Sequence, residues 1–146
     1  MFSSLLYGLE HCAIGPRDRS CLDGYFLRLA KRVMRLRFDH HLSYAEAEEQ
    51  LGVRRPSIKL TRERLRWVGH VLRSEDLVLR EVLSFIPAGG ARGRGRPHRR
   101  YYDTIKTDLV DLNIVITSRE QSQFWEELRI VAADRNRWRS VVEGRR

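Results

Sequence analysis

The chain has 146 residues, is 42% apolar and carries a formal net charge of +9, from 28 Lys and Arg against 19 Asp and Glu. This length suits one domain or two very small ones, and the apolar fraction excludes a fully disordered chain. The sequence has no run of ~20 apolar residues to span a membrane, no secretion signal and no disulfide framework, so we expect a soluble intracellular protein, cytoplasmic or nuclear, without a membrane partner.

The first expected element is an amphipathic helix over residues 18–37. At about 100° per residue one face is apolar, with Tyr25 at its margin. That face comprises Leu22, Phe26, Leu29, Val33 and Leu36. The opposite face is basic and carries Arg28, Lys31, Arg32 and Arg35. Such a face is either solvated or in contact with a polyanion, and the pattern leaves both interpretations open.

A short helix is expected from Ser43 to Leu51. Ser43 and Glu46 have the spacing of a capping box, and Gly52 suits the left-handed position that follows a helix. Residues 45–65 resemble a helix-turn-helix in spacing. However, Glu48 stands where that motif usually has a small residue, so a plain helix-loop-helix is the favoured interpretation.

A longer helix is expected from Pro56 to about Arg73. Its apolar residues lie on more than one face, which predicts burial on two sides. Beside them runs a basic stripe of Lys59, Arg62, Arg66 and Arg73. Gly69 lies between the stripe and an apolar face. A glycine in mid-helix costs up to ~1 kcal/mol relative to alanine, so Gly69 indicates the close approach of another helix or of a phosphate.

A helix over residues 77–86 precedes a linker, residues 87–100, that is rich in Gly, Arg and Pro. Within it, Gly93-Arg94-Gly95-Arg96-Pro97 resembles an AT-hook, whose Arg side chains enter the narrow minor groove of A·T-rich DNA. Short strings of Arg, Gly and Pro also occur in other linkers. General phosphate binding is therefore favoured over sequence-selective reading.

Two helices are expected after the linker, over residues 101–112 and over a long segment from Thr117 to Val142. Residues 114–116 are the only strand candidate, and three residues do not make a sheet. Arg135 falls within the apolar stripe of the last helix. A charge there must pair with an acid or face a polyanion, and a structural ion pair is favoured.

Signals for metal binding or catalysis are weak. No pair with the usual zinc-ligand spacing exists among His11, Cys12, Cys21, His40 and His41. Asp103, Asp108 and Asp111 spread around a helix and suit pairing with Arg better than binding two metal ions. His70 is expected to be packed or to lie next to a phosphate. We expect no metal, no cofactor, no small-molecule substrate and no catalytic residue.

The basic residues concentrate in three windows. Residues 28–37, 54–73 and 92–100 carry +5, +6 and +5, so the rest of the chain carries −7. Of the 28 basic residues, 25 are Arg, whose planar guanidinium binds phosphate bidentately. A GC-rich genome could explain the excess of Arg over Lys, but it does not explain the clustering. Basic surfaces on a mildly acidic body indicate a polyanion partner.

Several of these segments occur in a specific order: Leu5-Leu6-Tyr7-Gly8, the helix from Leu22 to Leu36, Leu65 to Arg73, Gly93 to Pro97, Asp103-x-x-x-x-Asp108-Leu109, and Ala133-Asp134-Arg135-x-x-Trp138-Arg139. The collinear set resembles the C-terminal part of non-LTR retrotransposon reverse transcriptases of the endonuclease type. The resemblance implies a thumb-like region over residues 1–86, the basic linker 87–100 and a tail over residues 101–146. The Tyr-x-Asp-Asp active-site motif of that family, an RNA-directed DNA polymerase, is absent from this sequence.

We therefore expect an all-α protein, a small bundle of about five to six helices with a basic loop before a C-terminal helical pair. The main hypothesis is a non-catalytic segment that binds the backbone of a template duplex or RNA–DNA hybrid. The expected contact residues are Arg28, Arg32, Arg35, Lys59, Arg62, Arg66, Arg73, Arg92, Arg94, Arg96, Arg99 and Arg100. The alternative is a helical protein-interaction module or a degenerate retroelement relic, and an independent enzyme is least favoured.

Overall fold

The computed structural model describes residues 6–37, 39–85, 99–118 and 120–144. Over these residues the chain forms α-helices and one short 3-10 turn but no strand, which confirms the all-α class. In chain order the elements are η1 (Leu9–His11), α2 (Pro16–Val33), α3 (Tyr44–Leu51), α4 (Pro56–Arg73), α5 (Leu77–Ser84), α6 (Tyr101–Asp111), α7 (Gln121–Ala133) and α8 (Arg135–Glu143).

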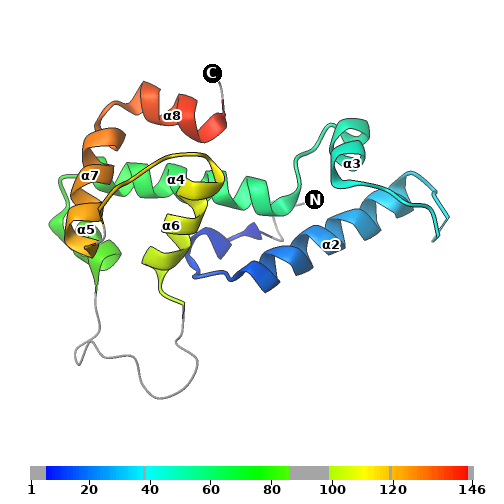
Figure 1. Cartoon of the computed structure of the whole chain (residues 1–146), viewed down its shortest axis with the longest axis horizontal. Coiled ribbons are helices and arrows are strands. Elements are labelled where there is room, and N and C mark those ends of the chain that lie inside the picture. The colour runs from blue at the N-terminus through cyan, green and yellow to red at the C-terminus, as the bar shows by residue number, and fades with distance from the viewer. Residues whose placement is uncertain (1–5, 38, 86–98, 119, 145–146) are drawn as a thin grey trace, which may run out of the picture.

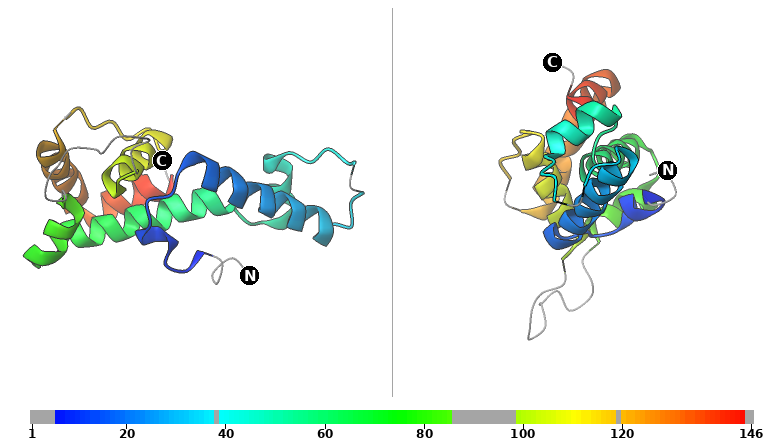
Figure 2. Two further views of the ribbon diagram at one scale, coloured as in Figure 1. Left: turned by 90° about the horizontal axis from the view of Figure 1, so that it is seen from below. Right: turned by 90° about the vertical axis from the view of Figure 1, so that its right-hand side faces the viewer.

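Helix α4 is the central element, and it runs along the long axis of the molecule (Figure 1). Helices α7 and α8 pack against its C-terminal half, whereas α2 lies beside its N-terminal half (Figures 1 and 2). Half of the 18 residues of α4 are buried, on more than one side. The predicted burial on two sides is therefore confirmed, because apolar residues on several faces of α4 let helices pack around it.

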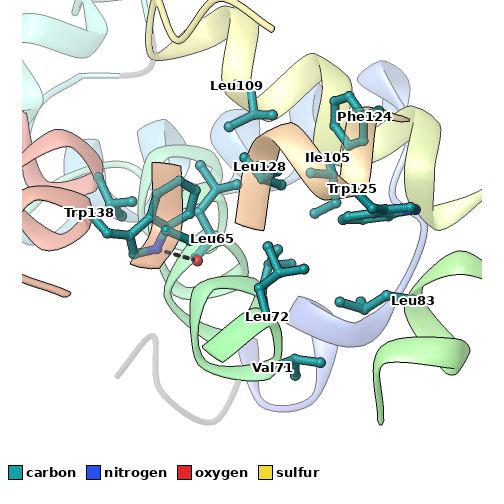
Figure 3. Close-up of a cluster of buried hydrophobic side chains, with 13 residues drawn as sticks. Leu65, Val71, Leu72, Leu83, Ile105, Leu109, Phe124, Trp125, Leu128 and Trp138 are labelled. Carbon is teal, nitrogen blue, oxygen red and sulfur yellow. Dashed lines mark hydrogen bonds between the residues drawn. The ribbon is translucent and has the colours of Figure 1, made fainter. Parts of the chain in front are cut away.

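The main core lies where α4, α6 and α7 meet, with Leu83 of α5 and Trp138 of α8 at its borders (Figure 3). Its buried side chains include Leu65 and Leu128. Residues before and after the predicted linker contribute to this cluster, so the two predicted helical regions share one core. Residues 114–116 form no strand; Ile114 and Ile116 pack on the cluster and Val115 is exposed.

A second, smaller cluster joins α2 to α3. Phe26 and Ala30 of α2 pack against Ala47 of α3 and Leu42 before it. Val33, predicted to face the core, is instead 62% exposed, because α2 ends there and Arg35 takes a left-handed conformation with φ of 52°. The chain then turns away from the apolar face.

The predicted signals at the ends of α3 are confirmed. The hydroxyl of Ser43 accepts a hydrogen bond from the backbone N–H of Glu46, and the Glu46 carboxylate accepts one from the backbone N–H of Ser43. The Ser43 hydroxyl also donates to this carboxylate, and the hydrogen bonds that the carboxylate receives from the backbone N–H and the hydroxyl of Ser43 lower the pKa of Glu46. Gly52 ends the helix in the left-handed region with φ of 62°.

The long helix predicted from Thr117 to Val142 is wrong in two respects. Helical structure begins at Gln121 rather than at Thr117, and the segment is not one helix. Asp134 adopts an extended conformation and divides the segment into α7 and α8. Its carboxylate accepts hydrogen bonds from the backbone N–H groups of Asn136 and Arg137 at 2.9 and 3.0 Å, so it caps the start of α8. The helical periodicity continues across the break, and for that reason the apolar stripe alone does not reveal it.

A buried charge network ties α4 and α6 to α2. Asp108 and Arg64 are both fully buried and form an ion pair of 2.7 Å. The Asp108 carboxylate also accepts hydrogen bonds from Thr61 and Arg19, and Arg19 pairs with Asp111 at 2.8 Å. Arg64 belongs to a basic window of the sequence, but its charge is neutralised inside the protein.

Candidate nucleic-acid interface

A groove between α4 and α8 is lined by basic side chains from both helices. It has a volume of about 560 Å³. Its lining comprises Arg66, His70 and Arg73 of α4 together with Arg135, Trp138, Arg139 and Glu143 of α8. The lining residues of α4 are spaced by three or four, and on α8 Arg135, Arg139 and Glu143 are spaced by four, which places each set on one face of its helix. The groove therefore exists because two helical faces cross at this point.

Close packing of α8 on α4 sets the floor of the groove. The indole of Trp138 is buried, and its Nε1 donates a hydrogen bond to the backbone carbonyl of Leu65 at 3.0 Å (Figure 3). Gly69 lies directly beneath this ring. The sequence left two explanations for Gly69, the close approach of another helix or of a phosphate. The structure shows that helix α8 makes this close approach.

The groove carries an excess of positive charge. Four guanidinium groups line it and Glu143 is the one carboxylate among its lining residues, so with neutral His70 the lining has a formal charge of +3. Burial of Arg73 and the nearby positive charge of Arg135 lower the pKa of Arg73. Arginine still remains protonated at neutral pH. A bound anion would relieve the repulsion between these two side chains.

The two predicted arginines of the groove have different local roles. Arg73 is partly buried and donates a hydrogen bond from Nη1 to the backbone carbonyl of Ala132 at 2.9 Å, near the end of α7. Arg66 is exposed and pairs with Glu143 at 3.2 Å. Arg73 therefore stabilises the packing of α7 on α4, and Arg66 has its side chain at the surface.

The other two members of the predicted α4 stripe lie outside the groove. Lys59 is near Glu63, with 3.8 Å between Nζ and Oε1. Arg62 is half-buried, and its Nη2 lies 3.6 Å from the position that a Cβ on Gly144 would take. Arg62 is therefore next to the C-terminal end of α8, while Lys59 is further toward the start of α4.

The basic face of α2 forms a separate surface. Arg28, Arg32 and Arg35 are exposed, and the Arg28 guanidinium lies 6.0 Å from the ring centre of Tyr25. None of the three lines the groove between α4 and α8. The structure therefore leaves this face open to a ligand but does not merge it with the groove.

The predicted linker residues are only partly described. Arg92, Arg94 and Arg96, together with the AT-hook-like segment, lie outside the described residues. Arg99 folds onto α6, where its Nε donates to Thr104 Oγ1 at 3.0 Å. Arg100 is the residue before α6, and its backbone N–H donates to the Asp103 carboxylate at 3.0 Å. Both residues thus help to begin a helix.

Sequence reasoning missed the contribution of α8. Arg135 is exposed and lines the groove, whereas the sequence favoured a structural ion pair within an apolar stripe. The break at Asp134 changes the direction of the helix, so the side chain of Arg135 leaves the stripe. The spacing of four between Arg135 and Arg139 was the available signal, because it places both on one helical face.

Comparisons with known proteins add no relative: no protein-family model, no curated protein and no solved structure matches this chain. No helix in the described part of the chain is long and apolar enough to cross a membrane. Within the same residues, no three His, Cys, Asp or Glu side chains come together in a group that could hold a metal ion.

Proposed function

We propose that this chain is a non-catalytic segment that binds the phosphate backbone of a nucleic-acid duplex or RNA–DNA hybrid. The observation that carries the proposal is the groove between α4 and α8, where four arginines face solvent-accessible space with one carboxylate among them. Arginine binds phosphate bidentately, and backbone contacts of this kind supply most of the non-specific affinity for nucleic acid.

The resemblance to the C-terminal part of non-LTR retrotransposon reverse transcriptases supports the same proposal, because such a segment would hold the duplex near a polymerase without taking part in its chemistry. The carboxylates of α6 also fit a non-catalytic role. Asp108 is buried against Arg64, and Asp111 pairs with Arg19. These acids are engaged in holding the fold together.

Salt-dependent binding tests the proposal. A short labelled duplex and the corresponding RNA–DNA hybrid are titrated with the protein at several salt concentrations. We expect log affinity to fall linearly with log salt. The triple variant Arg66→Ala, Arg135→Ala and Arg139→Ala should lower the steepness of that line by about 2 to 3, since each phosphate contact contributes about 0.9 on duplex DNA.

The matched control removes three exposed arginines that lie outside the groove: Arg17, Arg37 and Arg54. It changes the net charge by the same amount, so a general charge effect would alter both variants equally. Equal slopes for the two triple variants, or the absence of any salt-dependent binding by the wild type, would contradict a site in the groove.

The alternative, a protein-interaction module, is favoured by one feature of α5. Leu77, Val78, Val82 and the adjacent Phe85 are each more than three-fifths exposed. Clustered apolar side chains at a surface commonly mark a contact with another protein. Sedimentation at increasing protein concentration tests this second candidate: association that Val78→Ser and Val82→Ser abolish would support it, and a monomer at all concentrations would argue against self-association through α5.

A further inference from the structure

A single oxygen of the Glu143 carboxylate, which lines the groove, pairs with two guanidinium groups. Oε1 of Glu143 lies 3.2 Å from Nη2 of Arg66 and 3.1 Å from Nε of Arg139. The Glu143 side chain is only 11% exposed, whereas those of Arg66 and Arg139 are 51% and 71% exposed. Two donors from different helices thus converge on one anionic oxygen at the edge of open space.

The charges of α8 run against the preference of its helix dipole. Arg135 is the first residue of the helix and Glu143 is the last. A cation is disfavoured at a helix N-terminus and an anion at its C-terminus, each by a few tenths of a kcal/mol at the surface. The helix dipole therefore does not account for either residue. Both do, however, line the groove between α4 and α8.

We propose that Glu143 Oε1 occupies the position of a phosphodiester oxygen, so that Glu143 is an intramolecular competitor for the nucleic-acid backbone. This inference rests on the proposed function of the groove. When a backbone phosphate enters, one of its non-bridging oxygens takes the hydrogen bonds of Arg66 and Arg139. The Glu143 side chain then turns toward solvent, which its three rotatable bonds allow.

Because the Glu143 carboxylate competes for the two arginines, a ligand must gain more from the groove than the ion pairs that it displaces. A single phosphate ion must displace the Glu143 carboxylate in exchange for similar contacts, so its net gain is small. A polynucleotide presents several phosphates on one chain and also reaches Arg73 and Arg135, and the linked contacts offset the displacement. The groove should therefore discriminate between a continuous backbone and small anions.

The test compares Glu143→Gln with Glu126→Gln on the full chain. Both variants remove one negative charge, but Glu126 pairs with Arg129 on α7 and does not line the groove. We expect Glu143→Gln to bind a short duplex about two to five times more tightly than the wild type, the gain expected from removing an ion-pair competitor for two exposed arginines. Glu126→Gln should change the affinity by less than about twofold.

Two further variants show whether Glu143 competes with phosphate or instead positions the arginines for it. Adding Arg66→Ala to Glu143→Gln should return the affinity to the wild-type value or below, because the gain depends on Arg66. Glu143→Asp keeps the charge but shortens the side chain, and it should give an intermediate affinity. Circular dichroism and thermal unfolding establish that each variant is folded.

The outcomes distinguish this inference from the proposed function. If the wild type binds through the groove arginines but Glu143→Gln binds equally or more weakly, Glu143 positions the arginines and the inference is overturned. If Glu143→Gln and Glu126→Gln tighten binding equally, the effect is one of net charge and the inference is again overturned. If the groove arginines have no effect on the salt dependence, the proposed function fails and the inference fails with it.

Discussion

The indole ring of Trp138 lies against the backbone of Gly69, where α8 crosses α4. A Cβ atom at Gly69 would come within 3.0 Å of Nε1, Cδ1 and Cε2 of the indole. Trp138 is 2% exposed, and its Nε1 is held by the carbonyl of Leu65, so the ring has little room to move. This contact fixes the distance between the two helices and hence the width of the groove.

The first prediction is that Gly69→Ala destabilises the protein by about 1–3 kcal/mol, as overpacking of a well-packed interior usually does. The added methyl group must displace Trp138 and weaken its hydrogen bond to Leu65. Alanine is the better helix former by up to ~1 kcal/mol, so propensity alone gives the opposite sign. Chemical denaturation, followed by circular dichroism, measures the free energy of unfolding.

Gly24→Ala is the matched control for that prediction. Gly24 lies in the middle of α2, and a Cβ there would meet no atom within 4 Å. Only the gain in helix propensity remains, so this variant should be more stable than the wild type by up to ~1 kcal/mol. Two variants of equal stability would show that Trp138 does not constrain Gly69.

The helices could largely be predicted because their signals are local. Ser43, Glu46 and Gly52 define α3 through a cap at each end, and Pro56 begins α4. The break between α7 and α8 was missed although Asp134 is also a cap. Periodicity favours a continuous helix whenever the apolar spacing continues across a break, and only tertiary packing decides against it.

A second prediction concerns the buried ion pair of Arg64 and Asp108. Asp108→Asn leaves the Arg64 guanidinium buried without a counter-charge, which typically costs about 3–5 kcal/mol. Asp111 lies on the same helix and also pairs with Arg19, but the Asp111 side chain is 51% exposed. Asp111→Asn therefore removes an exposed carboxylate. Its cost should stay below ~1 kcal/mol. Parallel denaturation curves check the difference, and equal losses would contradict the role of burial.

Tyr101 leads to a prediction on pH. Burial raises the pKa of the Tyr101 hydroxyl, an effect that the charge of Arg64 opposes in part and those of Asp108 and Glu10 reinforce. The hydroxyl also donates a hydrogen bond to the carbonyl of Glu10 at 3.1 Å. The folded state therefore favours the protonated form.

Because the pKa of Tyr101 is raised on folding, its contribution to stability is fully present below the unfolded-state pKa of about 10 and is lost as the pH rises above that value. The free energy of unfolding of the wild type should fall in this alkaline range more steeply than that of Tyr101→Phe. Denaturation at a series of pH values provides the measurement. Parallel profiles for the two proteins would show that Tyr101 ionises equally in the folded and unfolded states.

The site was less predictable than the helices. Arg66 and Arg73 could be placed on one basic stripe from their spacing on α4 alone, but their meeting with Arg135 and Arg139 depends on how α8 packs after the break at Asp134. The net charge of a sequence window also includes buried side chains, which cannot contact a ligand at the surface. Arg64, in the middle of the most basic window, is fully buried.

The last prediction separates binding from stability within the groove. Arg135 is exposed at the first position of α8, where the helix dipole disfavours a cation, so Arg135→Ala should change the free energy of unfolding by less than ~0.5 kcal/mol. Arg73→Ala removes a charged hydrogen bond to the carbonyl of Ala132 and should cost about 1.5–3 kcal/mol. Both should lower the steepness of the salt dependence of duplex binding by about 0.9. Denaturation and salt titration of the same two variants give both quantities, and a loss of binding that merely follows the loss of stability would mean that Arg135 does not contact the backbone.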